Sequence, residues 1–200
     1  MRKREGDKER DILSAAIEVF AERGFHDTRI HSIADRAGIA TGTIYLYFGN
    51  KENILLRIFE VFWEQLYNRF ESINNSESLK SFEKYKALVD SLFDYFSRNP
   101  ALALLYVNEQ NYLMHKKTEE FTSFYRKAMG LIEKCLNEGI IAGAFDSSIS
   151  ASIAGRFFLG GFRLLIQEWV RAPERYGLDE LQRNIKTLLF TGLTGCVDLG

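Results

Sequence analysis

Helical periodicity is the feature that most constrains what this chain can fold into. Only Pro100 and Pro173 interrupt its 200 residues. Between turn residues, apolar side chains recur at intervals of three and four, as they do along one face of an amphipathic helix. Residues 8–23 show the pattern at Ile12, Ala15, Ala16, Val19 and Phe20. The periodicity predicts an all-α protein of about nine helices.

Glycines near the start divide the pattern into short segments. Gly24, Gly38 and Gly49 follow apolar segments, so we expect helices over 8–23, 28–36 and 40–47, with Asp27 or Thr28 capping the second. A long helix should follow over 51–73, and later helices near 77–98, 101–114, 117–139, 148–171 and 178–196. We expect a three-helix domain over residues 1–50, joined by the long helix to a helical domain over residues 51–200.

Charge and hydropathy limit the possible partners. The formal net charge is −1, so nothing draws the whole chain towards a polyanion and any nucleic-acid site must be local. The longest fully apolar run, residues 101–107, is too short to span a bilayer. These features predict a soluble cytoplasmic protein with no membrane partner.

Catalytic and metal-binding patterns are not found in the sequence. The histidines, His26, His31 and His115, are scattered, and neither Cys135 nor Cys196 has a second ligand at metal-binding spacing. The sequence therefore predicts no enzyme activity, no metal site and no cofactor. A helical protein that sequesters a lipid-like ligand without binding DNA is the alternative interpretation.

The stretch AGIATGTIYLYFGNK, residues 37–51, contains no acidic residue. It lies where two short predicted helices meet at a glycine turn, which is the arrangement of a helix-turn-helix. Ile44 and Phe48 are four positions apart and should pack inward, whereas Gly42, Thr43, Tyr45 and Leu46 should point outward or flank them. An acid-free, hydroxyl-rich helix can pass between rows of phosphates. An ordinary helical hairpin would show the same bare pattern.

The block from Ile12 to Leu55 resembles the N-terminal domain of TetR-family transcriptional regulators. The resemblance is carried by GFHDT before the second helix, IADRAGI at the turn, GTIYLYF on the third helix and the pair Lys51-Glu52. It implies phosphate contacts from Thr28, Tyr45, Tyr47 and Lys51. It implies groove or base contacts from Arg29, His31, Thr41, Gly42 and Thr43. Leu46 departs from the family pattern, which often has histidine at this position, and we expect Leu46 to contact a thymine methyl group or a sugar. A solvated surface position is the alternative for His31, and packing on the fourth helix is the alternative for both tyrosines. Ala40 departs from the family pattern, so a cap must come from Thr41 or be missing.

The larger half of the chain is rich in aromatic residues, and the resemblance implies that it encloses a pocket for a small apolar effector. Candidate contacts are Phe93, Phe96, Leu105, Phe124, Phe157, Phe158 and Arg163. Plain core packing is the alternative for the aromatic residues, and a solvated position is the alternative for Arg163. GTIYLYFGNKENIL, LNEGIIAGAF and Trp169 resemble the acyl-CoA-responsive repressors of fatty-acid degradation. An acyl-CoA is therefore the leading expectation, with other apolar or aromatic compounds as alternatives.

The last two predicted helices resemble the family's dimer-forming bundle. The residues expected at this interface are Gly160, Leu181, Ile185, Leu188, Leu189 and Gly192. The expected function is that of a homodimeric repressor that binds a palindromic operator in double-stranded DNA and is released by its effector.

Overall fold

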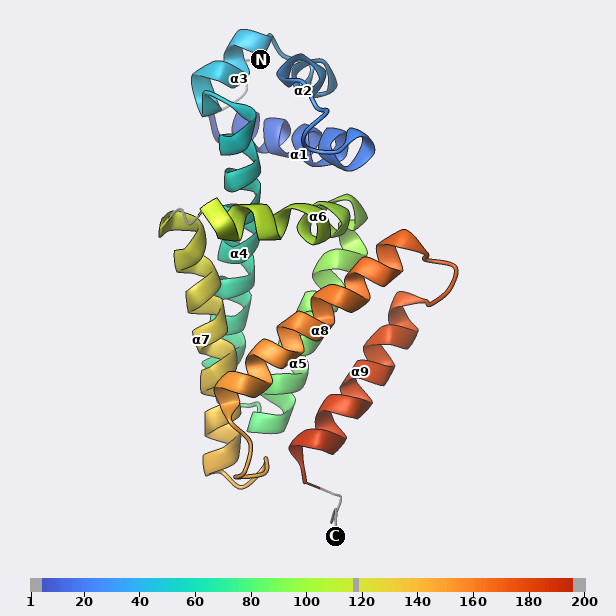
Figure 1. Ribbon diagram of the computed structural model, residues 1–200. Coiled ribbons are helices and arrows are strands. Elements are labelled where there is room, and N and C mark those ends of the chain that lie inside the picture. The colour runs from blue at the N-terminus through green and yellow to red at the C-terminus, as the bar shows by residue number, and fades with distance from the viewer. Residues whose placement is uncertain (1–4, 117–118, 196–200) are drawn as a thin grey trace. The chain divides into compact units, whose positions relative to one another are not determined.

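The computed structural model describes residues 5–116 and 119–195, and within them every regular element is a helix (Figure 1). The helices are α1 (Glu5–Arg23), α2 (Ile30–Ala37), α3 (Thr41–Phe48), α4 (Lys51–Asn74), α5 (Ser81–Arg98), α6 (Pro100–Lys116), α7 (Glu119–Ile141), α8 (Ala151–Arg171) and α9 (Leu178–Leu193). The predicted all-α class is confirmed. In these described ranges no helix is both long and apolar enough to cross a membrane.

Contacts between residues divide the chain into two compact units. The first comprises residues 1–62 and 101–122, and the second comprises residues 63–100 and 123–200. The long helix α4 contributes to both units. Each unit has its own core and is described by itself below.

The core of the first unit forms where α1, α2 and α3 meet. The apolar face predicted for α1 is buried at Ile12, Ala15, Ala16, Val19 and Phe20. Ile33 and Ala34 of α2 and Ile44 and Phe48 of α3 are buried as well. Burial of these side chains stabilises the unit, because apolar area removed from water contributes about 25 cal/mol per Å².

Helix α6 belongs to the first unit although it is distant in sequence. Its Tyr106 ring lies 5.5 Å from the ring of Phe62 and 6.3 Å from that of Phe59, measured between centroids. Further towards its end, the Tyr112 ring lies 5.8 Å from Phe25 and 6.1 Å from His26. Aromatic contacts therefore tie α6 to α4 and to the loop between α1 and α2.

Helix α2 begins at Ile30 rather than at residue 28. Its N-cap is Arg29, which makes no side-chain capping bond, so neither Asp27 nor Thr28 caps the helix as predicted. The Thr28 hydroxyl instead donates to the Gly24 carbonyl oxygen at 2.7 Å. This threonine closes the turn after α1, and the sequence pattern alone does not distinguish that role from a cap.

Helix α5 also begins later than predicted, at Ser81. A carboxylate oxygen of Glu83 accepts the backbone N–H of Lys80 at 2.9 Å, which fixes the start of the helix. Residues 76–79 lie outside it, and the Ser76 and Ser78 hydroxyls form a hydrogen bond with each other at 3.0 Å.

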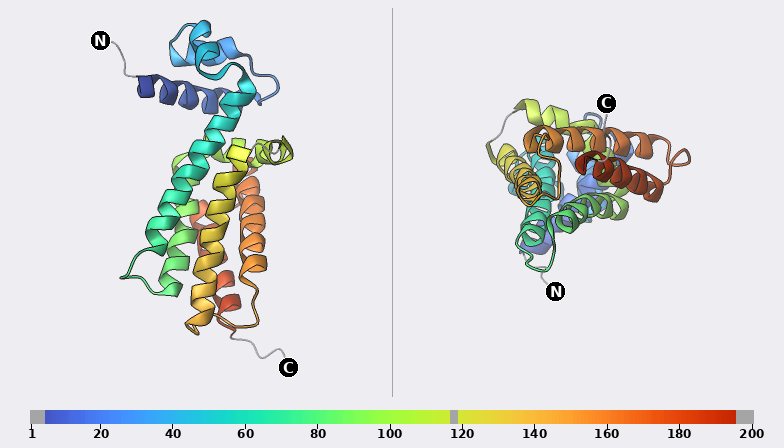
Figure 2. Two further views of the ribbon diagram at one scale, coloured as in Figure 1. Left: turned by 90° about the vertical axis from the view of Figure 1, so that its left-hand side faces the viewer. Right: turned by 90° about the horizontal axis from the view of Figure 1, so that it is seen from below.

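The second unit has an aromatic core. The ring of Phe162 lies 5.0 Å from Phe93, 5.8 Å from Phe96 and 6.0 Å from Phe158. Helix α9 packs on α5 (Figures 1 and 2), where Asp90 accepts hydrogen bonds from Gln182 at 2.7 Å and from Lys186 at 2.6 Å. One face of α9 therefore packs against α5 of the same chain.

Candidate functional site

The turn between α2 and α3 is built on Gly38, which adopts a left-handed conformation at φ 65° and ψ 37°. Its N–H donates to the Asp35 carbonyl oxygen at 3.2 Å, and the N–H of Ile39 donates to the Ala34 carbonyl oxygen at 3.0 Å. A residue with a Cβ would be strained at this φ. The turn therefore sets the direction in which α3 leaves α2.

Helix α3 is buried on one face and exposed on the other. Ile44 is fully buried and Phe48 is 9% exposed, whereas Tyr45 is 54% and Leu46 is 82% exposed. The inward and outward faces predicted for this helix are confirmed. The helix contains no acidic residue. An exposed leucine contributes little to folding, so the Leu46 side chain is available for contact with a partner.

The N-terminus of α3 lacks a side-chain cap. Its N-cap is Ala40, and no side chain of the described chain accepts a capping bond there, so the cap that Thr41 was one candidate to supply is missing. N–H groups in the first turn of a helix have no partner within the helix, and they carry partial positive charge. They can therefore donate to a phosphate.

Two asparagines fix the junction between α3 and α4. The Asn50 side chain accepts the N–H of Asn53 at 2.8 Å, and the Asn53 amide donates to the Phe48 carbonyl oxygen at 2.7 Å. Our interpretation of the sequence assigned neither residue a role at the start of α4. Asparagine immediately before a helix is a strong N-cap signal, so Asn50 could have been found. Asn53 could not, because its partner depends on the turn at Gly49.

The Lys51 ammonium points into the first unit. It donates to the carbonyl oxygens of Phe25, His26 and Thr28 at 2.9, 2.7 and 3.2 Å, and it lies 4.8 Å from the centroid of the Phe25 ring. An ammonium has three protons to donate, and all three are used. The phosphate contact predicted for this side chain would cost these bonds, so its observed role is to hold the loop between α1 and α2.

The remaining residues predicted to contact DNA differ in accessibility. Thr28 is 3% exposed, so its side chain cannot reach a phosphate as the resemblance implied. Arg29 and His31 are exposed at the start of α2, and Gly42 is exposed on α3. Thr41, Thr43 and Tyr47 are half-buried.

Ion pairs hold α2 against α1. Arg36 contacts Glu18 at 2.8 Å and Glu22 at 2.7 Å. Hydrogen bonding from the Arg36 guanidinium lowers the pKa of Glu22. These groups are well exposed, so the pairs contribute little stability. Their effect is to fix the orientation of α2, and through the Gly38 turn that of α3.

The residues predicted to contact an effector are not all brought together. Phe93, Phe96 and Phe158 are buried around Phe162 in the second unit, whereas Leu105 belongs to the first unit. Phe124 is half-buried, with the Lys127 ammonium 5.1 Å from its ring centroid, and Arg163 is half-buried. Phe157 is 75% exposed and cannot line an interior pocket of the chain, which corrects its predicted role.

Tyr85 is a polar residue in the aromatic interior that our interpretation of the sequence missed. It is 1% exposed, and its ring lies 6.0 Å from Phe145, 6.2 Å from Phe158 and 6.1 Å from Phe190. Its hydroxyl has no hydrogen-bond partner within the described ranges. Burial, with a smaller contribution from Cys135, raises the pKa of Tyr85 above its usual range. A buried hydroxyl without a partner is costly and calls for an explanation.

An apolar stripe is exposed along α8. Ile153, Phe157 and Leu164 are 71%, 75% and 57% exposed, and Gly160 lies between them at helical spacing. On α9, Leu188 is 69% exposed. We call these four side chains, with Gly160, the α8–α9 stripe. These exposed apolar side chains are candidates for an interaction surface.

The other residues predicted at the dimer interface are less accessible. Leu181 is 7% exposed and packs within its own chain, so its assignment to the interface is corrected. Ile185 and Leu189 are half-buried and Gly192 is exposed. A further glycine of α8, Gly155, is buried, and a Cβ there would lie 3.4 Å from Ile132, an ordinary van der Waals distance. The packing of α8 on α7 therefore does not require glycine at this position.

Within the described ranges, no group of His, Cys, Asp or Glu side chains could hold a metal ion. Cys135 is buried, and burial raises the pKa of its thiol to about 12. Cys196 lies outside the described residues.

Comparison with known families gives two matches along the chain. Residues 12–58 match the family described as bacterial regulatory proteins, tetR family. Residues 78–193 match the family described as tetracyclin repressor-like, C-terminal domain. Together the matches cover both the candidate DNA-binding helices and the aromatic second unit.

Individual relatives extend the similarity to nearly the whole chain. A fatty acid metabolism regulator protein of Bacillus subtilis is 30% identical over 194 residues, covering 96% of this chain and 98% of the relative. The structure of the fatty acid degradation regulator FadR from Bacillus halodurans has a TM-score of 0.83 at 29% identity, over 96% of this chain and 98% of that one. The structure of FadR from Bacillus subtilis in complex with stearoyl-CoA has a TM-score of 0.78 at 28% identity, over 92% and 98% of the two chains.

Proposed function

The chain belongs to the TetR family of bacterial transcriptional regulators, and on this premise we propose that it is a DNA-binding repressor that an acyl-CoA releases from its operator. The observation that carries the DNA-binding part is the outward face of α3. It offers Tyr45, Leu46 and an uncapped N-terminus, and no acidic side chain.

Helix α3 is the recognition element in this proposal. In a major groove, phosphates flank the helix on both sides, so the absence of acids avoids repulsion. The Thr41 and Thr43 hydroxyls and free N–H groups can bond to phosphates, and Leu46 is placed to contact a thymine methyl group. Arg29 and His31 add donors from the start of α2.

A single substitution on this face tests the DNA-binding function. Leu46→Asp places a carboxylate at a position that is 82% exposed, so folding stability should change by no more than about 0.5 kcal/mol. DNA containing the promoter of the protein's own gene should shift with the wild type in a gel and not with this variant. The control is Ile141→Asp, which adds the same charge at a position 87% exposed on α7. Equal DNA binding by Leu46→Asp and wild type would contradict the proposal.

The repressor acts as a homodimer on a palindromic operator in this proposal. The α8–α9 stripe supplies an apolar surface, and a two-fold axis pairs the same surface on each subunit. Two recognition helices related by such an axis read half-sites about 34–36 Å apart, or a near multiple of that distance.

An acyl-CoA is the proposed effector. Support comes from the relative of known structure that was solved with stearoyl-CoA and from the aromatic interior of the second unit. The unpartnered Tyr85 hydroxyl is the candidate hydrogen-bond donor to a polar atom of the effector. A ligand can release DNA only if it binds the DNA-free state more tightly than the DNA-bound state.

A further inference from the structure

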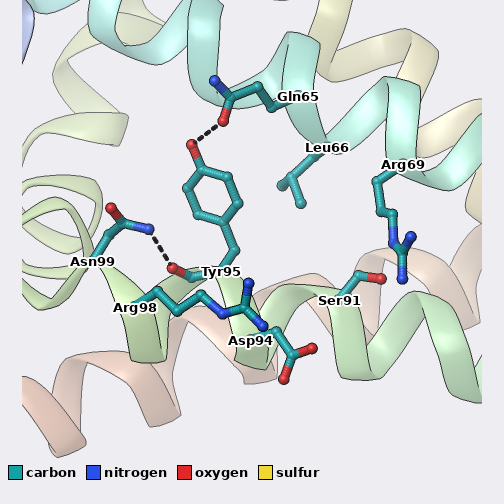
Figure 3. A pocket seen from close by; sticks show the side chains of 8 residues that line it. All are labelled: Gln65, Leu66, Arg69, Ser91, Asp94, Tyr95, Arg98 and Asn99. Carbon is teal, nitrogen blue, oxygen red and sulfur yellow. Dashed lines mark hydrogen bonds between the residues drawn. The ribbon is translucent and has the colours of Figure 1, made fainter.

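A solvent-open cavity of about 480 Å³ lies between α4 and α5 within the second unit, and the Arg69, Asp94 and Arg98 side chains that line it are exposed (Figure 3). All of its lining residues except Leu66 have polar side chains. The volume is in the range of small-ligand sites, but such sites are usually lined mainly by apolar side chains. The polar walls therefore favour a polar ligand, in contrast to the aromatic interior proposed for the acyl chain.

Two arginines face this cavity from different helices. Arg69 reaches in from α4 and Arg98 from the last turn of α5 (Figure 3). Within the part of the chain that the structure describes, neither guanidinium makes a hydrogen bond or an ion pair. Arg36, Arg57 and Arg156, by contrast, are all ion-paired. Each guanidinium thus keeps its five N–H donors for a ligand.

The two walls of the cavity are joined by a hydrogen bond. The Tyr95 hydroxyl donates to the Gln65 side-chain oxygen at 2.7 Å, from α5 to α4. Burial raises the pKa of Tyr95 to about 12, so this donor keeps its proton at neutral pH. The Asn99 amide is engaged with the Tyr95 carbonyl oxygen at 2.8 Å. The hydrogen bond between Tyr95 and Gln65 restrains the spacing of the two helices.

We propose that this cavity binds a phosphate-bearing small molecule, with Arg69 and Arg98 donating to its phosphate oxygens. A phosphate monoester carries a charge of about −1.5 to −2 at neutral pH and offers three acceptor oxygens. Two planar forks from opposite walls match that charge and geometry better than a single carboxylate would. Asp94 lies beside Arg98, and its negative charge leaves Arg69, Arg98 and Asp94 with a combined charge of +1 (Figure 3). The Asp94 carboxylate can accept a hydrogen bond from a hydroxyl of the same ligand.

The phosphate has two possible sources. It belongs either to a free phosphorylated metabolite or to the coenzyme part of an acyl-CoA. The second source rests on the effector function proposed above, and the first does not.

Calorimetric titration of the full-length protein tests the site with two probes, coenzyme A without an acyl chain and ADP. Arg69→Ala and Arg98→Ala should each raise the Kd at least about tenfold, because each removes charge-assisted hydrogen bonds. The control is Lys86→Ala, which removes one exposed cation from the same helix as Arg98 and should leave the Kd unchanged. Arg98→Lys keeps the charge without the planar fork and should give an intermediate Kd.

The outcomes separate the two sources. Arginine-dependent binding of coenzyme A but not of ADP supports the site and assigns it to the effector. Arginine-dependent binding of ADP, with or without coenzyme A, supports a site for free phosphorylated metabolites. The proposal is overturned if neither probe binds the wild type, or if both arginine variants bind like the wild type. Failure of stearoyl-CoA to release DNA would overturn the effector function alone, since ADP binding is measured without it.

Discussion

Among single residues, Lys51 allows a test of whether its side chain holds the loop between α1 and α2 or contacts DNA. Lys51→Ala removes bonds to three loop carbonyls and should destabilise the protein by roughly 1.5–3 kcal/mol. We expect weaker operator binding with an unchanged dependence on salt, because this ammonium releases no counterion from DNA. Fluorescence anisotropy titrations over a range of salt concentrations measure both quantities.

Arg29→Ala is the matched control. It removes an exposed cation at the start of α2, and it should lower the salt slope by about 0.9 for each phosphate that the variant no longer neutralises. If Lys51→Ala instead lowers the slope by that amount, its ammonium leaves the loop when DNA binds.

Tyr85 carries a prediction about stability. Tyr85→Phe removes a buried hydroxyl that has no partner in the described part of the chain, so the protein without effector should gain about 1 kcal/mol in unfolding free energy. Burial raises the folded-state pKa of Tyr85 above that of the unfolded chain. The contribution of Tyr85 to stability should therefore be kept up to about pH 10 and lost above it, so Tyr85→Phe should lose less stability than the wild type between pH 8 and pH 10.5. Urea denaturation at pH 8 and pH 10.5 measures both effects. A less stable Tyr85→Phe protein at pH 8 would show that the hydroxyl has a partner.

At the scale of helices, the α8–α9 stripe makes the dimer testable. Phe157→Asp and Leu188→Asp place charges on side chains that are 75% and 69% exposed in the single chain. The monomer fold should persist, whereas the dimer should dissociate because a charge buried in the interface has no partner. Light scattering coupled to size exclusion gives the mass in solution. Dimers that survive both substitutions would place the interface elsewhere, and Ile141→Asp should leave the mass unchanged.

Periodicity predicted the helices well but not always which side of a helix faces inward. On α1 the apolar side chains form one narrow face, and that face is buried. Helix α8 is apolar on several sides, so the sequence could not show that Phe158 is buried while its neighbour Phe157 is exposed. Leu181 and Leu188 lie on one helix that packs on α5 with part of its surface only.

The DNA-binding candidates were predictable in part for a similar reason. The spacing of Ile44 and Phe48 predicts which face of α3 points inward, and the burial of both residues confirms that prediction. The positions of Thr28 and Lys51 depend on where the loop after α1 folds back, which is a contact between residues distant in sequence. The polar cavity between α4 and α5 likewise needs two helices in register before Arg69 and Arg98 share it.

For the molecule as a whole, release of DNA by an effector requires two states that differ in their affinities for DNA and for the effector. Moving a population from about 1:99 to 99:1 requires roughly 5.5 kcal/mol of differential binding. Three parts of the chain connect the two units covalently: α4, the junction of α5 with α6, and the beginning of α7. These connections offer covalent routes by which an effector in the second unit can act on the DNA-binding helices.

Release of promoter DNA by stearoyl-CoA is the behaviour that defines an acyl-CoA-controlled repressor. Fluorescein-labelled DNA carrying the protein's own promoter is first saturated with the wild-type protein, and its anisotropy is followed as stearoyl-CoA is added. We expect the anisotropy to fall to that of free DNA. Free coenzyme A at the same concentrations should leave the protein–DNA complex intact. A complex that keeps its full anisotropy in saturating stearoyl-CoA, or a protein that never binds this DNA, would contradict this expectation.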